Sequence, residues 1–424
     1  MKRIWTLPVI LLLAGLLSVP GCGEDQTEET TKSDNGKDGQ TQTEPISLSQ
    51  PNVETDALSE AEAQQAQNLI NGGVRYLLER QGPGGGWTFG EGAYEPAATG
   101  LVINVLVRHP DFDHDDPVIK KAFDAMLKYR QPDGGIYDPE VGLANYTTSI
   151  AIMALTSAGN PDHKPIIDEA VKFLKGLQVT AGEETPAGDT ISEDHPYFGG
   201  FGYGSKNERP DGSNAGMAVE ALKQAGVDPN SEVMQNARVF LSRMQNRKET
   251  NPLEWAQQGP NDGGFIYAPA KADTSVGESK AGPAQGGGLR SYGSLTYAAF
   301  KSMLHAGLER DDPRVRDALS WIKGHWTFER NPGMPINQDR KHHLQGLYYY
   351  YNMMAKALNA WGEPTITDSD GNEHNWRAEL IDALAKRVRD NGSWVNTGHE
   401  RWLESDPVLV TCYATGALQE TIRK

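Results

Sequence analysis

Cysteine is almost absent from this chain, whose 424 residues contain only Cys22 and Cys412. Cys22 directly follows an apolar N-terminal stretch, where its sulfur is expected to serve a separate purpose. Cys412 then has no partner, so no disulfide is predicted in the folded part. A hydrophobic core must therefore hold the fold together, and the chain is long enough to bury one.

Clusters of Lys and Arg are also lacking, and the formal net charge is −17. Nucleic-acid binding depends on such clusters to neutralise phosphates, so nucleic acid is excluded as a partner. Metal-binding patterns are missing as well: there is no HExxH or CxxC, and the adjacent His342 and His343 would point apart on a helix. We expect neither a metal nor another cofactor.

The first 22 residues have the pattern of an export signal. Two basic residues precede a short apolar stretch over 4–19. The following Val19-Pro20-Gly21-Cys22 resembles the lipobox of bacterial lipoproteins, in which Pro20 is an uncommon occupant. The resemblance implies cleavage before Cys22, lipidation of its sulfur and anchoring in the bacterial cell envelope, with the membrane as a partner. A plain secretory signal or an uncleaved anchor is the alternative.

Residues 23–58 are mostly Thr, Gln, Glu, Asp, Ser and Lys, with few apolar side chains. Such a composition buries too little surface to offset the entropy of ordering the chain. We therefore predict a signal peptide over 1–22, a disordered acidic tether over 23–58 and a folded domain over 59–424.

One short stretch recurs along the folded domain. Gln81–Trp87 reads QGPGGGW, and Gln131–Tyr137 repeats its frame of Gln, three residues, Gly, one residue and an aromatic. Looser copies lie at 199–203, 263–267 and 391–394. Glycine permits turns with positive φ, and the aromatic residue can pack into a neighbouring helix pair. Each copy, called an elbow below, therefore predicts a turn between two helices, and its recurrence predicts a repeat architecture.

Two kinds of helix are predicted to alternate between the elbows. Amphipathic helices, often begun by Asp and Pro, are expected over 61–80, 117–130, 164–178, 231–246, 312–326 and 375–390. Helices that are apolar almost all round are expected over 96–109, 145–159, 213–226, 290–307, 344–361 and 406–422. A helix without a polar face must be enclosed by others. The alternation favours an inner and an outer ring of helices, with an open superhelix of helix pairs as the competing arrangement.

At this point the chain resembles a known family. Gln-x-x-x-Gly-x-Trp is the QW motif of squalene and oxidosqualene cyclases, matched at Gln81–Trp87 and, with Tyr in place of Trp, at Gln131–Tyr137. The repeats are similar to prenyltransferase/squalene oxidase repeats over about 60–424. The resemblance implies an all-α (α/α)6 toroid, a closed ring of six inner and six outer helices, as in terpenoid cyclases. One fold hosts many activities, so the motif is informative about fold and weak about chemistry.

The catalytic residues known from this fold do not carry over. The string Asp113-His114-Asp115-Asp116 matches the Asp-x-Asp-Asp acid motif of class II cyclases, but it precedes an outer helix, and Asp311-Asp312-Pro313 repeats its end. Helix capping explains both copies. The Asp, Cys and His zinc set of protein prenyltransferases and the Cys-Gly-Glu-Gln thioester run are missing. Whether the protein is an enzyme stays open, and its catalytic residues are unknown.

Polar side chains at the starts of the inner helices are the candidates for lining a central cavity, because the ring would open there. A buried guanidinium among them would need an anionic or carbonyl partner. The candidates are Tyr146, Thr148, Asp211, Asn214, Arg290, Tyr292, His343, Tyr348 and Asp406. Helical spacing places Tyr348 and Tyr351 on one side and turns Tyr349 and Tyr350 away from it.

A second pattern appears when the inner helices are aligned on their terminal glycines. Glu220, Lys301 and Lys356 then fall at one level of three consecutive inner helices, in apolar surroundings. This predicts a buried Glu220–Lys301 ion pair with Lys356 nearby. Such a pair fixes helix register, or alternatively supplies a lysine of lowered pKa for catalysis.

Three functions remain open. The first is an envelope-tethered toroid that binds a small apolar or isoprenoid-like ligand, with unproven activity. The second is a toroid that binds or degrades carbohydrate, using two of Asp211, Asp339 and Asp406 across the cavity. The third is a non-enzymatic envelope scaffold. The walls of the cavity discriminate among them, and the oligomeric state is not predicted.

Overall fold

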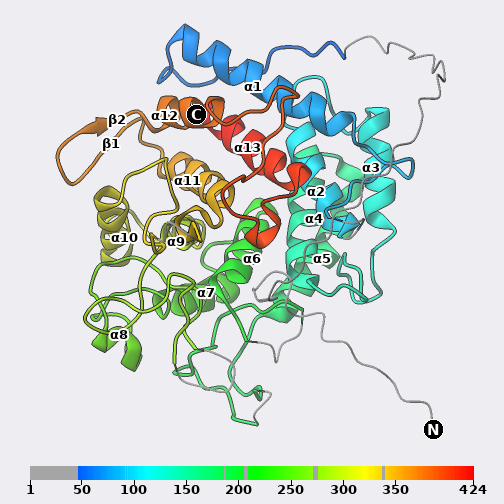
Figure 1. The fold of residues 1–424 in the computed structure, drawn as a ribbon. Helices are drawn as coiled ribbons and strands as arrows, with labels where there is room; N and C mark the ends of the chain where they lie inside the picture. Colours follow the sequence, from blue (N-terminus) through cyan, green and yellow to red (C-terminus); the bar gives the residue numbers. More distant parts are fainter. Residues whose placement is uncertain are drawn as a thin grey trace, which may run out of the picture.

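The structure is a computed structural model, which describes residues 46–424 except 91, 93, 186–187, 205–208, 271–275 and 337–339. Within the described residues, outer helices alternate with inner helices as predicted (Figure 1). The outer helices are α1 (Glu60–Leu78), α3 (Pro117–Leu127), α5 (Lys164–Leu177), α7 (Glu232–Ser242), α10 (Pro313–Gly324) and α12 (Trp376–Ala385). The inner helices are α2 (Glu95–Leu106), α4 (Ala144–Ala158), α6 (Gly212–Gln224), α9 (Gly293–His305), α11 (Leu347–Trp361) and α13 (Pro407–Thr421).

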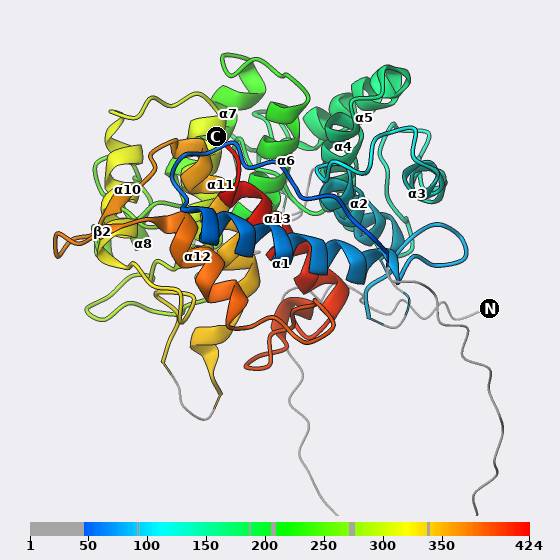
Figure 2. The same cartoon turned by 90° about the horizontal axis from the view of Figure 1, so that it is seen from above.

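The inner helices form a closed ring. Each packs against the next inner helix along the chain, and α13 packs against α2 to complete the circle. The outer helices surround this ring, with α3 on α2, α5 on α4, α10 on α9 and α1 on α13 (Figure 2). The protein is therefore an α/α toroid rather than an open superhelix.

Short elements decorate the ring. They are the helix α8 (Glu254–Gln258), the 3₁₀ turns η1 (Pro161–His163), η2 (His342–Leu344) and η3 (Arg401–Leu403), and a hairpin of β1 (Ile366–Thr367) and β2 (Glu373–His374). The two strands pair antiparallel, with Ile366 opposite His374. None of these elements interrupts the alternation of inner and outer helices.

Asp and Pro residues begin the outer helices as expected. The Asp116 side chain accepts a hydrogen bond from the Val118 amide at 2.7 Å, and Asp312 does the same for the Arg314 amide at 2.9 Å. Each caps an amide that the first turn leaves without a partner. Asp115 lies exposed beside Lys120. The Asp113–Asp116 string thus caps an outer helix.

The elbow glycines are required where one hairpin meets the next. Gly199 has φ +80°, and a Cβ added there would lie 1.9 Å from the carbonyl oxygen of Asn236 on α7. At the other end of the chain, Gly392 has φ +79°, and its Cβ would lie 2.6 Å from the carbonyl oxygen of Gly72 on α1. Only glycine accepts both the backbone conformation and the close approach. The last elbow therefore packs against the first helix.

One part of the elbow alignment is wrong by one residue. The Trp87 amide donates to Thr99 Oγ1 on α2, and the equivalent bond on α4 runs from Ile136, not from Tyr137, to Thr148. Ile136 is fully buried, whereas Tyr137 lies at the edge. The second match to the QW motif is thus a coincidence of spacing, because the position equivalent to Trp87 is an isoleucine.

Two other elbows keep the glutamine, which lies far from its glycine in the sequence. The Gln178 side chain donates to Gly199 O at 3.0 Å and to Val233 O at 2.8 Å, and Gln245 bonds Gly263 and Arg314 in the same way. Residues 179–198 and 246–262 are therefore insertions within elbows. They hide the motif from the sequence without disturbing the helix connection.

Residues 46–58, which the composition assigns to a disordered tether, are instead packed on the ring. The Gln67 side chain donates to Pro51 O at 2.6 Å, and the Glu54 amide donates to Ile422 O at 2.7 Å. Leu48, Val53 and Leu58 lie against the hydrophobic core. The predicted tether is therefore wrong for these residues. The predicted signal peptide, Cys22 and residues 23–45 lie outside the described residues.

Among the described residues, no helix has the length and apolar character needed to cross a bilayer.

Candidate ligand-binding cavity

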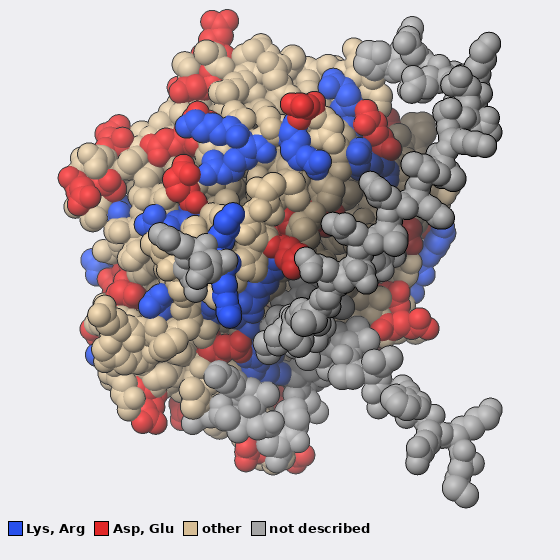
Figure 3. Space-filling view, viewed as in Figure 1, with Lys and Arg blue, Asp and Glu red and all other residues tan. Residues whose placement is uncertain are grey.

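A cavity of about 470 Å³ occupies the centre of the ring, and each inner helix contributes to its wall. This volume is in the range of small-molecule sites. Figure 3 shows that one face of the ring is hollowed near its centre, with both acidic and basic side chains around the hollow. The cavity runs from the N-terminal to the C-terminal ends of the inner helices, and its two ends differ in chemistry.

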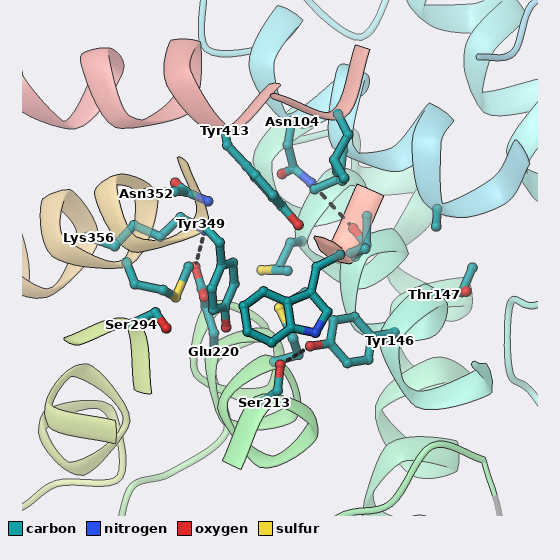
Figure 4. A pocket seen from close by; sticks show the side chains of 18 of the residues that line it. Asn104, Tyr146, Thr147, Ser213, Glu220, Ser294, Tyr349, Asn352, Lys356 and Tyr413 are labelled. Atoms are coloured by element: carbon teal, nitrogen blue, oxygen red, sulfur yellow. Dashed lines mark hydrogen bonds and ion pairs between the residues drawn. The ribbon is translucent and has the colours of Figure 1, made fainter. Parts of the chain in front are cut away.

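The end formed by the N-termini of the inner helices is aromatic. The Tyr146 hydroxyl bonds Ser213 Oγ, and the Tyr203 hydroxyl bonds that of Tyr267 at 2.8 Å. Figure 4 shows Tyr349 and Tyr413 projecting into the same space from the opposite side. The aromatic residues of the wall are Phe89, Tyr94, Tyr146, Tyr203, Tyr267, Tyr292, Tyr349, Trp402 and Tyr413.

The middle of the wall is aliphatic. Three methionines, Met153, Met217 and Met353, line it from α4, α6 and α11. Leu101 on α2 and Ile150 on α4 complete the band. Methionine adapts to irregular apolar shapes, so this band suits a flexible hydrocarbon.

Near the C-terminal ends of the inner helices the wall becomes charged. Lys356 Nζ lies 2.8 Å from Glu220 Oε1, and Lys301 binds the other oxygen of the same carboxylate. The structure thus brings together the three residues that the helix alignment predicts at one level. Burial alone would raise the pKa of Glu220, but the two lysines lower it well below its ordinary value. Glu220 and Lys356 face the cavity, and Lys301 is buried behind them.

A second ion pair lies at the same end. Arg108 Nη2 is 2.6 Å from Glu420 Oε1, and Nδ2 of the Asn359 side chain donates to Glu420 Oε2 at 2.9 Å. Arg108, Glu420 and Arg423 all line the cavity. Sequence reasoning missed these residues because they come together only when α13 meets α2 to close the ring.

Glu404 is a further cavity residue that the sequence does not reveal. Its carboxylate accepts the amides of Tyr348 at 2.9 Å and Tyr349 at 2.8 Å, at the start of α11. Burial raises its pKa to about 7, although these donors lower it. The two residues before it have left-handed backbones, with φ +61° at both. Glu404 therefore joins a strained loop to α11 and fixes the first turn from which Tyr349 projects.

Two of the predicted cavity residues line the cavity, Tyr146 and Tyr292. Thr148, Asp211 and Asn214 do not, and each is buried with structural partners. Thr148 Oγ1 accepts a hydrogen bond from the Ile136 amide of the second elbow. Asp211 caps α6 by accepting hydrogen bonds from the Ser213 and Asn214 amides at 2.9 and 3.0 Å. Helix starts favour caps for local reasons, so polarity there selects caps together with cavity residues such as Thr147, Ser213 and Ser294.

The remaining predictions at the helix starts are also wrong. Asp406 caps α13 through the Val408 amide at 2.8 Å, and Arg290 and His343 lie half-buried outside the cavity wall. Tyr348 packs edge-on against Tyr351 with ring centroids 5.7 Å apart, while its neighbour Tyr349 faces the cavity. The spacing correctly pairs Tyr348 with Tyr351 but does not show which side of α11 faces inward.

The sequence does contain a signal that predicts part of the aromatic wall of the cavity. Phe89, Tyr203 and Tyr267 each follow an elbow aromatic by two residues, and all three line the cavity. Asp339, the third carboxylate considered for carbohydrate cleavage, lies outside the described residues. In the part of the chain that the structure describes, no three His, Cys, Asp or Glu side chains gather as metal ligands.

The ring and its cavity place the protein among the α/α toroids with a ligand-sized central cavity. No family model matches the sequence, and no curated protein matches it significantly.

Solved structures share the fold. The type II terpene cyclase MstE from Scytonema matches with 16% identity and a TM-score of 0.51, over 86% of this chain and 99% of the other. A D-mannose isomerase matches with 10% identity and a TM-score of 0.54, over 86% and 99%. An α-amylase from Clostridium perfringens matches with 13% identity and a TM-score of 0.50, over 83% and 97%. At these identities the likeness shows a terpenoid cyclase-like toroid fold and leaves the chemistry to the site.

Proposed function

We propose that this protein binds an apolar, isoprenoid-like ligand in its central cavity. The observation that carries the proposal is the aliphatic band of Met153, Met217 and Met353 beneath an aromatic end wall. Methionine and aromatic surfaces suit the methyl branches of an isoprenoid chain. The fold adds support by analogy, because MstE has been solved with geranylgeranyl dihydroxybenzoate, a substrate with an isoprenoid chain.

The two other functions fit the cavity less well. A scaffold would fill its centre with its own side chains, whereas here about 470 Å³ is free. Carbohydrate cleavage needs two carboxylates facing the substrate, but Asp211 and Asp406 are helix caps. The glutamates of the wall are already held by other groups, Glu220 by lysines, Glu420 by Arg108 and Glu404 by backbone amides. Sugar-processing neighbours share the fold, so carbohydrate binding is the second candidate, carried by the charged end of the cavity.

We further propose that the ring acts in the bacterial cell envelope, anchored through lipidated Cys22. The support is the basic start, the apolar stretch over 4–19 and the lipobox-like end of the leader.

Filling the cavity tests the ligand proposal. Met217, which is 8% exposed on α6, is replaced by Trp, and the exposed Gln65 on α1 is replaced by Trp as the matched control. Both purified proteins are extracted with organic solvent and the extracts are compared by mass spectrometry. We expect a co-purifying lipid in the wild type and in Gln65→Trp, reduced about 10-fold or more in Met217→Trp. Equal recovery from both variants, or recovery of sugars alone, would contradict the proposal.

A further inference from the structure

The cavity is polarised along the axis of the ring, and its charged end has an excess of cations. Two lysines, Lys301 and Lys356, share the single carboxylate of Glu220. Arg108 is paired with Glu420, and Arg423 lines the cavity in addition. Cations therefore outnumber carboxylates at this end, inside a protein whose net charge is −17.

Helix dipoles account for the position of Arg108 and Arg423, which directly follow the ends of α2 and α13, but not for that of Lys356. Lysines and arginines near helix C-termini usually interact with the last carbonyl groups. Lys356, however, lies more than a turn before the end of α11 and donates to Glu220. Its side chain is 21% exposed, and it faces the cavity rather than the helix end.

Unused hydrogen-bonding groups lie at the same end. Asn352, one turn before Lys356 on α11, is 7% exposed, and its Oδ1 has no partner among the described residues. Thr156 Oγ1 on α4 is likewise buried without a partner in the described part of the chain. Both residues line the cavity, and Figure 4 shows Asn352 beside Lys356. A carboxylate or phosphate accepts hydrogen bonds, so the Asn352 Nδ2 group and the Thr156 hydroxyl are the uncharged donors that these two residues bring to this end of the cavity.

We propose that the ligand is an amphipathic anion, with its apolar body along the methionine band and its carboxylate or phosphate group at Lys356, between Asn352, Thr156 and Arg108. The aromatic end then encloses the far tip of the apolar body. This inference rests on the proposed function, because it assigns a head group to the isoprenoid-like ligand. A carboxylate and a phosphate monoester share the chemistry that the cations recognise.

The test compares three C20 isoprenoids with the same chain: geranylgeranoic acid, geranylgeranyl monophosphate and the neutral geranylgeraniol. Binding to the delipidated protein is measured by isothermal titration calorimetry, with inorganic phosphate as a fourth probe. We expect at least one of the two anions to bind about 10-fold or more tightly than the alcohol. The variant Lys356→Met should lose this preference, whereas Lys356→Arg should keep it. The exposed Lys223 on α6 lies outside the cavity wall, so Lys223→Met is the matched control and should behave as the wild type.

The outcomes separate this inference from the function on which it rests. If the alcohol binds as tightly as both anions, the head-group inference is wrong and the apolar-ligand proposal stands. If none of the three isoprenoids binds a folded wild-type protein, the proposed function fails as well. Inorganic phosphate that binds as tightly as the isoprenoid anions would overturn the amphipathic ligand, because a free ion would then suffice. Melting curves confirm that each variant is folded.

Discussion

Glu220 is the residue on which the charged end of the cavity depends. Replacing it by Gln leaves Lys301 buried without its counterion, so we expect Glu220→Gln to lower the free energy of unfolding by about 3–5 kcal/mol. Lys301→Met should lower the free energy of unfolding less, because Glu220 keeps its ion pair with Lys356 and the methionine fills a similar volume. Urea denaturation of both variants provides the measurement.

A larger loss for Lys301→Met than for Glu220→Gln would contradict this assignment. The loss of stability at acid pH gives an independent check. The two lysines hold the pKa of Glu220 below its ordinary value, against the effect of burial. A carboxyl of this kind contributes stability that is complete above its unfolded pKa of about 4.3 and is lost as the pH falls towards the folded value. Between about pH 5 and pH 3, the wild type should therefore lose more stability than Glu220→Gln.

At the scale of the element, the elbow is the unit that sets one hairpin against the next. Gly199→Ala combines a left-handed backbone with a Cβ only 1.9 Å from Asn236 O, so we expect a loss of about 2–4 kcal/mol. Gly226 is the matched control, because it has φ +82° but open space around its Cβ position. Gly226→Ala should cost only the backbone strain, about 1–2 kcal/mol. Equal denaturation midpoints for the two variants would show that the close approach to α7 is unimportant.

The same elements show how far sequence reasoning reaches. The alternation of inner and outer helices is predictable because amphipathic periodicity, Asp caps and elbow glycines are local signals. The orientation of a helix that is apolar all round is not, since nothing in α11 itself distinguishes the side of Tyr348 from that of Tyr349. The positions of Glu404 and Arg108 in the cavity wall could not be predicted from the sequence, for a different reason. Their roles depend on contacts with residues 55 or more positions away in the chain.

For the whole molecule, the envelope assignment rests on Cys22. Cys22→Ser removes the sulfur that would carry the lipid and leaves residues 46–424 unchanged. We expect the variant, expressed in a bacterial host, to leave the membrane fraction while its purified ring keeps the melting temperature of the wild type. Metabolic labelling with a fatty-acid analogue checks the modification directly. A wild-type chain that takes up no label would contradict the lipoprotein assignment.

The contact of Gly392 with Gly72 joins the last elbow to the first helix. Close to the C-terminal end of α13, the Glu54 amide also donates a hydrogen bond to Ile422 O. Until α12 and α13 are present, α1 lacks its main neighbours and the side of α2 that meets α13 stays uncovered. In a nascent chain of this protein, the ring of inner helices therefore cannot close before α13 has emerged. We therefore expect the apolar face of α1 to stay accessible to chaperones until α13 has been synthesised.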